Sequence, residues 1–147
     1  PISFLTPNII ASNKLYLIPD ANLYMFGVME SNVHMAWMRV VCGRLKSDYS
    51  YSPSVYNNFP WPDPSDAQKA AIEKTAQAIL DARALYPDAS LADLYDPLSM
   101  PPELLKAHQA NDRAVMQAYG MPIKETDEAA CVAWLMRLYQ EKVSAQV

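Results

Sequence analysis

The sequence has 147 residues and a net charge of −4, and 51% of its residues are hydrophobic. This is enough apolar material for one domain, or for a small domain with a helical tail, while the acidic balance argues against a free-standing DNA-binding protein. No apolar run approaches the roughly 18 residues of a membrane span, no signal-peptide pattern opens the sequence, and three glycines in the whole chain exclude a glycine-rich cofactor loop or a P-loop.

The first 19 residues contain two short runs rich in Ile, Leu and Tyr, at 8–11 and 14–18. Such runs predict strands, but the segment supplies few partners for them, so further strands would have to come from elsewhere in a longer protein. Between the runs, residues 12–14 are also compatible with a solvent-facing turn.

Two helices are predicted next, over residues 20–30 and from residue 31 or 32 to residue 42. Asp20 is a candidate cap for the first, and Ser31 or Asn32 for the second. The second helix is apolar nearly all round, which is typical of a buried helix. Gly43 follows it at the position where helices often stop.

After this stop, polar side chains fall at every second residue: Lys46, Asp48 and Ser50. In an extended segment these three would share one face, with Tyr49 and Tyr51 on the other. Lys donates to guanine, a carboxylate accepts from cytosine and Ser does either, so the row has the groups that read base edges. Two flanking cations, Arg39 and Arg44, are candidates for phosphate contacts. The competing interpretation is a solvated edge strand or loop.

Residues 56–62 read YNNFPWP, which holds the residue types of the amino-methyltransferase motif in the wrong order. We interpret this stretch as structural, with Phe59 and Trp61 packing where the chain leaves the polar row. The remaining sequence predicts a small helical bundle. Its expected elements are a helix over 64–86 with a capping box at Ser65 and Gln68, a turn over 91–95, a helix opened by Pro101 and Pro102 that runs through Tyr119 and is stopped by Gly120, and a last helix starting at Thr126 or Asp127.

The overall expectation is a mainly α fold with a small β portion. Charge is divided unevenly along it, because residues 1–62 hold four basic and three acidic side chains and residues 63–147 hold eight and thirteen. Any DNA contact is therefore expected in the first part. The scattered histidines and cysteines argue against a zinc site; the thiols of Cys42 and Cys131 are expected to be buried and free in a reducing cytoplasm. On one helix, His108 and Asp112 are four residues apart and predict a polar pair.

Four strings carry a family resemblance: HMAWMRVVCGRLKSDYSYS, VYNNFPWP, LADLYDPLSMPPELLKAHQ and DRAVMQAYG. They resemble the recognition domain and helical C-terminal tail of MmeI-like type IIG restriction–modification enzymes. The resemblance implies a longer polypeptide that joins an endonuclease, an S-adenosylmethionine-dependent adenine-N6 DNA methyltransferase and a recognition domain. It further implies that residues 1–62 are the distal part of that recognition domain and residues 63–147 a helical domain, with no catalytic, cofactor or metal residue in this chain.

The implied partners are double-stranded DNA and the upstream methyltransferase domain. The resemblance also suggests that Asn13 and Lys14 lie on a second DNA-facing strand. Unpaired strand edges in the isolated chain predict a homo-oligomer in concentrated solution. Two functional hypotheses result: a DNA recognition module in which Lys46 and Asp48 read one G·C pair, or a helical interaction module that makes no DNA contact.

Overall fold

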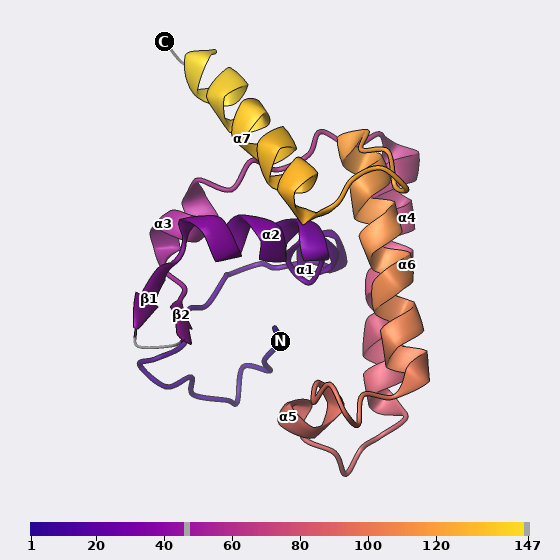
Figure 1. Cartoon of the computed structure of the whole chain (residues 1–147). Helices are drawn as coiled ribbons and strands as arrows, with labels where there is room; N and C mark the ends of the chain where they lie inside the picture. The colour runs from indigo at the N-terminus through magenta and orange to yellow at the C-terminus, as the bar shows by residue number, and fades with distance from the viewer. Residues whose placement is uncertain (46–47, 146–147) are drawn as a thin grey trace.

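A computed structural model describes residues 1–45 and 48–145. Over these residues it contains seven helices and one two-stranded antiparallel sheet (Figure 1). The prediction of a mainly α fold with a small β portion is confirmed. Among the described helices none combines the length and the apolar composition needed to cross a membrane.

Residues 1–22 form an irregular segment that runs below α1 and α2 in the view of Figure 1. Its turns are held by hydrogen bonds from the N–H of Ile9 to the carbonyl of Thr6 and from Leu15 to Ser12. The predicted strands at 8–11 and 14–18 are therefore wrong for the described chain, because no neighbouring strand pairs with their backbone. Large apolar side chains in the segment are exposed: Phe4, Leu5, Ile9, Ile10, Leu15, Tyr16 and Leu17.

Helices α1 (Leu23–Met29) and α2 (Asn32–Val41) follow as predicted. The cap of α1 is Asn22 rather than Asp20, whose backbone has a φ of 54° and lies in the left-handed region. The cap of α2 is Ser31, one of the two predicted candidates, and its hydroxyl accepts from a backbone N–H in the first turn.

Strands β1 (Gly43–Leu45) and β2 (Asp48–Ser50) form an antiparallel hairpin. The register places Gly43 opposite Ser50 and Arg44 opposite Tyr49. The predicted single extended segment is replaced by two antiparallel strands, so Arg44 lies on a different strand from Asp48 and Ser50. Lys46 and Ser47 lie outside the described residues. The short helix α3 (Pro53–Asn57) comes next.

The helices of the second half match the predicted ones closely. They are α4 (Asp66–Ala84) with the predicted capping box of Ser65 and Gln68, α5 (Leu91–Leu94), α6 (Pro102–Tyr119) and α7 (Glu128–Ser144), which is capped by Asp127. Gly120 ends α6 with a φ of 73°, a left-handed conformation that favours glycine.

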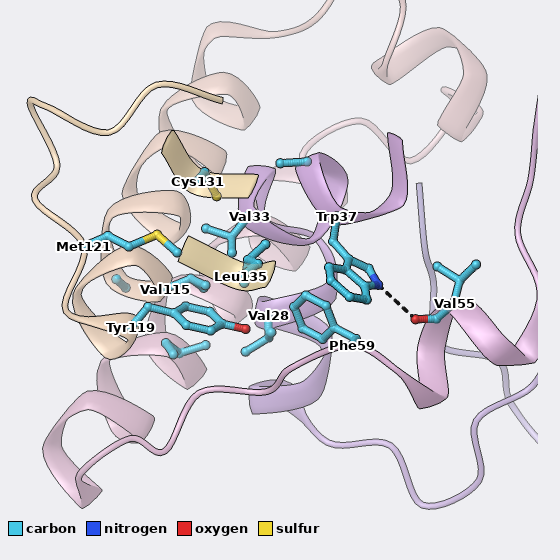
Figure 2. Close-up of a cluster of buried hydrophobic side chains, with 13 residues drawn as sticks. Val28, Val33, Trp37, Val55, Phe59, Val115, Tyr119, Met121, Cys131 and Leu135 are labelled. Carbon is cyan, nitrogen blue, oxygen red and sulfur yellow. Dashed lines mark hydrogen bonds between the residues drawn. The ribbon is translucent and has the colours of Figure 1, made fainter. Parts of the chain in front are cut away.

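Two clusters of buried side chains hold these elements together. One joins α2, α3, α6 and α7 and includes Trp37, Phe59 and Leu135 (Figure 2). The other joins α1, α4, α5 and α6 and includes Phe26 and Ile79. Helices α4 and α6 lie side by side, α1 packs on α4, and α7 packs on α2. The helical bundle is thus completed by helices from the first 62 residues.

The contact between α1 and α4 is close at Gly27. A Cβ atom added there would lie 2.7 Å from Cγ2 of Ile72, so only glycine lets the two backbones approach this far. The buried side chain of Asn111 on α6 donates to the Gly27 carbonyl at 2.7 Å and accepts from the Thr75 hydroxyl at 2.9 Å. This contact ties three helices together and gives α2, which follows α1 directly, a rigid base.

Candidate nucleic-acid interface

The hairpin carries two of the predicted base-reading residues. Asp48 and Ser50 are exposed and lie two residues apart on β2, so their side chains point to the same face. Lys46, the third member of the predicted row, lies outside the described residues. The structure therefore supports a carboxylate and a hydroxyl side by side, on a hairpin that extends from the end of α2 (Figure 1).

The opposite face of the hairpin holds a cation and an aromatic ring. The guanidinium carbon of Arg44 lies 4.5 Å from the centre of the Tyr49 ring, and Arg44 Nη2 donates to the Tyr49 hydroxyl at 2.9 Å. Because directly opposed residues of an antiparallel pair share a face, this pair projects away from Asp48 and Ser50. Arg44 thus does not extend the polar row. It forms a separate, planar, positively charged surface.

Arg39, the second predicted phosphate ligand, lies in the last turn of α2. Its Nη1 donates to a carboxylate oxygen of Glu128, at the start of α7, over 2.8 Å. Both side chains are well exposed, at 38% and 56%, so solvent screens their attraction. To contact DNA, Arg39 would exchange this carboxylate for a phosphate.

Asn13 and Lys14 are exposed in a turn at residues 12–15. The Leu15 N–H donates to the Ser12 carbonyl at 3.1 Å and closes this turn. The prediction that these two residues lie on a strand is wrong here, and the alternative of a solvent-facing turn describes the structure. Within the described residues no side-chain hydrogen bond joins this turn to the hairpin.

The base of the hairpin contains a polar contact that the sequence reasoning missed. The hydroxyl of Tyr51, the first residue after β2, lies 2.9 Å from Nε2 of His34 on α2. His34 is only 2% exposed, and the Phe59 ring meets it edge-on at 5.0 Å between centres. Burial lowers the pKa of His34 to about 4, and burial raises the pKa of Tyr51. The contact therefore joins two neutral groups at pH 7.

Helix α2 is fixed at its start by α6. Asp112 accepts from the backbone N–H of Asn32 at 2.8 Å and from its side-chain amide at 2.7 Å. The predicted pair of His108 with Asp112 is wrong, because His108 lies 2.6 Å from the Tyr95 hydroxyl instead. A carboxylate at a helix N-terminus also favours the helix electrostatically.

Farther along the same helix, the indole N–H of Trp37 donates to the Val55 carbonyl of α3 at 3.1 Å (Figure 2). The segment that follows the hairpin is thereby tied to α2, and buried Phe59 packs against the same indole. Phe59 and Trp61 meet edge-on at 5.5 Å between ring centres, which confirms the structural interpretation of residues 56–62.

Groups capable of other chemistry are separated. Cys131 is buried and Cys42 is half-buried, both as free thiols. In the part of the chain that the structure describes, no three His, Cys, Asp or Glu side chains come together as a metal ion would require. What the geometry offers is an exposed hairpin with two distinct polar faces, mounted on a buried helix.

Comparison with known proteins assigns the two parts of the chain. The family described as the MmeI target recognition domain matches residues 1–63, and the family described as the MmeI C-terminal domain matches residues 64–147. The chain is therefore of the restriction–modification class. It belongs to the MmeI family, and the resemblance carried by the four sequence strings is confirmed.

Two individual relatives agree with this assignment. DNA methyltransferase A of Bacillus subtilis (strain 168) is 42% identical over 142 residues, which cover 96% of this chain and 16% of that protein. A solved structure of the Type IIL restriction–modification enzyme MmeI in complex with DNA matches with a TM-score of 0.82 and 52% identity, over 86% of this chain and 17% of that one. The chain thus spans about a sixth of the length of these relatives.

Proposed function

We propose that this chain is the DNA sequence-recognition part of a longer adenine-N6 DNA methyltransferase. Double-stranded DNA is its ligand, and an upstream methyltransferase domain of the same polypeptide is its partner. The observation that carries the proposal is the exposed hairpin of a target recognition domain, with a carboxylate and a hydroxyl on one face and a stacked arginine on the other. The solved relative that contains DNA supports the choice of ligand.

In this proposal Asp48 accepts a hydrogen bond from N4 of cytosine, and Lys46 donates to O6 and N7 of the paired guanine. Ser50 reads a neighbouring base edge, and Asn13 and Lys14 approach a second one. Each good contact contributes roughly 1–3 kcal/mol of discrimination against the wrong base. Because the hairpin is only two strands wide, it fits the major groove, which admits a β-ribbon.

Arg44 and Arg39 hold phosphates in the same proposal. The Arg44 guanidinium is kept in place by the Tyr49 ring and hydroxyl, so little side-chain freedom is lost when it meets the backbone of DNA. Phosphate contacts fix the register of the protein on the duplex and carry no sequence information of their own.

S-adenosylmethionine and the methyl-transfer site belong, in this proposal, to the longer polypeptide. The residues of this chain do not form a glycine-rich loop that could hold such a cofactor. The chain has three glycines in all, and at one of them, Gly27, the side chain of Ile72 on α4 occupies the space beside the backbone. We assign no cofactor residue here. The whole enzyme is proposed to act in the cytoplasm.

The test of base reading exchanges the charges of Lys46 and Asp48. We expect the double substitution Lys46→Asp and Asp48→Lys, made in the longer methyltransferase, to change the preferred base pair at one position of the methylated site. Sequencing that detects methylated adenines gives the site preference directly. Unchanged preference together with unchanged activity would contradict the assignment of these two residues.

The test of phosphate binding removes Arg44. Arg44→Ala should weaken binding to all sequences alike and reduce the slope of log affinity against log salt concentration by about 1. Arg137→Ala is a matched control, because Arg137 also stacks on an aromatic ring, Trp134, at 4.7 Å but lies on α7. An equal loss of salt dependence in both variants would show that Arg44 has no particular role.

A further inference from the structure

We propose that Tyr51 and His34 form a positioning pair, in which their buried hydrogen bond fixes the direction in which the hairpin leaves α2. The pair thereby determines which base edge Asp48 meets, although neither residue touches DNA. This inference rests on the proposed function of the hairpin and names the residues that give the hairpin its specificity.

The hairpin has few other attachments to the body of the protein. Over the described residues its two strands contact each other far more than they contact any helix, and Arg44, Asp48, Tyr49 and Ser50 are all exposed. Packing of the sheet on a core therefore cannot set its direction. The strands must be directed from their two ends, where the chain enters from α2 and leaves toward α3.

At the entering end the connection is covalent, since one residue, Cys42, separates α2 from β1. At the leaving end the first side chain that reaches into the protein is Tyr51, which contacts His34. Four residues farther on, the Val55 carbonyl accepts from the Trp37 indole of the same helix. Both ends of the hairpin are thus attached to one rigid element, α2.

The side chain of His34 is held in one position by its surroundings. The residue lies in the first turn of α2, where its backbone N–H donates to the cap residue Ser31 at 3.3 Å, and Phe59 packs edge-on against its ring. With 2% of its surface exposed, the imidazole has no space to follow a moving hairpin. The Tyr51 hydroxyl must come to it.

The distance between Tyr51 and Asp48 makes this contact important for recognition, because a small rotation at Tyr51 becomes a large displacement at Asp48. Asp48 lies three residues before Tyr51, which corresponds to about 10 Å along a strand. A tilt of about 10° at Tyr51 would displace Asp48 by nearly 2 Å, more than the geometry of a hydrogen bond to a base tolerates. Losing the hydroxyl should therefore affect base discrimination more than it affects overall binding.

The experiment compares Tyr51→Phe with the unsubstituted protein in the longer methyltransferase. We measure kcat/KM on duplexes that contain the preferred site and on duplexes with each base pair of the site replaced in turn. Discrimination at the pair read by Asp48 is expected to fall about fivefold, the effect of one lost hydrogen bond, with less than a twofold change at the other pairs. Asp48→Ala, which removes the acceptor, identifies that pair independently.

Two further comparisons separate positioning from general stability. Tyr86→Phe is the matched control, because it removes a hydroxyl that donates to Glu103 at 3.0 Å beyond the end of α4, and it should leave discrimination unchanged. His34→Gln keeps a side-chain N–H and should retain discrimination, whereas His34→Leu should lose it. Because both residues act through one contact, the combination of His34→Leu with Tyr51→Phe should be no worse than either change alone.

The outcomes are distinguishable. If Asp48→Ala changes discrimination while Tyr51→Phe and His34→Leu only lower the melting temperature, the pair is merely structural and this inference is wrong. If Asp48→Ala itself leaves discrimination unchanged, it is the proposed function of the hairpin that is wrong, whatever the result for Tyr51. If His34→Leu does not fold, His34→Gln and Tyr51→Phe still decide the matter.

Discussion

Residues 1–22 and the helix pair α4–α6 differ in almost every physical respect. The first segment has no regular secondary structure and exposes large apolar side chains, including Ile10 at 97%. The helix pair has defined caps and contributes fully buried side chains such as Ile72, Ile79 and Leu104. Stability therefore resides in the helices, whereas the irregular segment keeps apolar side chains and backbone groups open for other contacts.

A buried ion pair between α4 and the end of α1 contacts the first segment at Ile2, and its loss should show the largest effect. Arg83 of α4 lies 3.2 Å from Glu30, with side chains 9% and 6% exposed, and Arg83 also donates to the Ile2 carbonyl at 2.8 Å. Arg83→Met leaves the Glu30 carboxylate buried without its cation, with the Ile2 N–H still donating to it, so we expect a loss of about 3–5 kcal/mol in the free energy of unfolding. Urea unfolding measures this loss.

The double substitution Arg83→Met and Glu30→Gln is the control for the ion pair. It removes the buried charge as well, and it should recover a large part of the stability. If Arg83→Met alone is as stable as the unsubstituted chain, the ion pair does not stabilise the contact between α4 and the end of α1.

Acid should weaken the helical body through His34. Its pKa in the folded state is lowered to about 4, so the unfolded chain binds more protons below pH 6.5 and stability is lost as the pH falls toward 4. Between pH 7.5 and pH 5.0 we expect a loss of about 2 kcal/mol from this group. Denaturant unfolding at the two pH values gives the difference.

His34→Leu should remove most of that dependence on pH. A smaller dependence of the same sign remains from His108, whose pKa is also lowered by burial. An unaltered difference between pH 7.5 and pH 5.0 in this variant would show that His34 is not the group that titrates.

A substitution at a helix cap should have a smaller effect on the free energy of unfolding. It again compares the helix pair with the irregular segment. Ser65→Ala removes the hydroxyl that accepts from the Gln68 N–H at 3.3 Å in the capping box of α4, and it should cost about 1 kcal/mol. Ser3→Ala in the irregular segment should change stability by less than about 0.5 kcal/mol. If thermal unfolding shows equal losses of stability for Ser65→Ala and Ser3→Ala, the helices do not contribute more to stability than the irregular segment.

The smallest effect on stability is expected for Ile10, which is almost fully exposed. Ile10→Asp should change the free energy of unfolding by less than about 0.5 kcal/mol. It should nevertheless reduce the homo-oligomer that we propose for the isolated chain at high concentration, because exposed apolar side chains and unpaired backbone favour association. Light scattering tests this, and a monomeric unsubstituted chain at high concentration would contradict it.

The helices were predictable because their signals are local. Ser31, Ser65 and Asp127 cap helices that begin directly after them, and Gly120 stops α6. Each of these interactions spans only a few residues, so neighbouring sequence contains all the information. The cap of α1 was the exception, because Asp20 and Asn22 are both suitable residue types and the left-handed backbone at Asp20 could not be foreseen.

The hairpin and its attachments were harder to predict. Residues 44–50 contain no glycine or asparagine that would mark a turn, so the sequence carries no local signal for the reversal between the strands. The partners of Arg39 and His34 are Glu128 and Tyr51, at separations of 89 and 17 residues. An apolar helix with one histidine shows that a polar partner is needed, but the residue that supplies it depends on the tertiary fold.

The central claim is that Asp48 reads a base edge from an exposed hairpin. Its most direct test is equilibrium binding of the longer methyltransferase, with Asp48→Ala, to its preferred duplex and to every duplex with one base pair replaced. We expect discrimination to fall at one pair, by roughly 1–3 kcal/mol, with the other pairs unaffected. Unchanged discrimination at every pair, or a uniform loss across all of them, would contradict the claim.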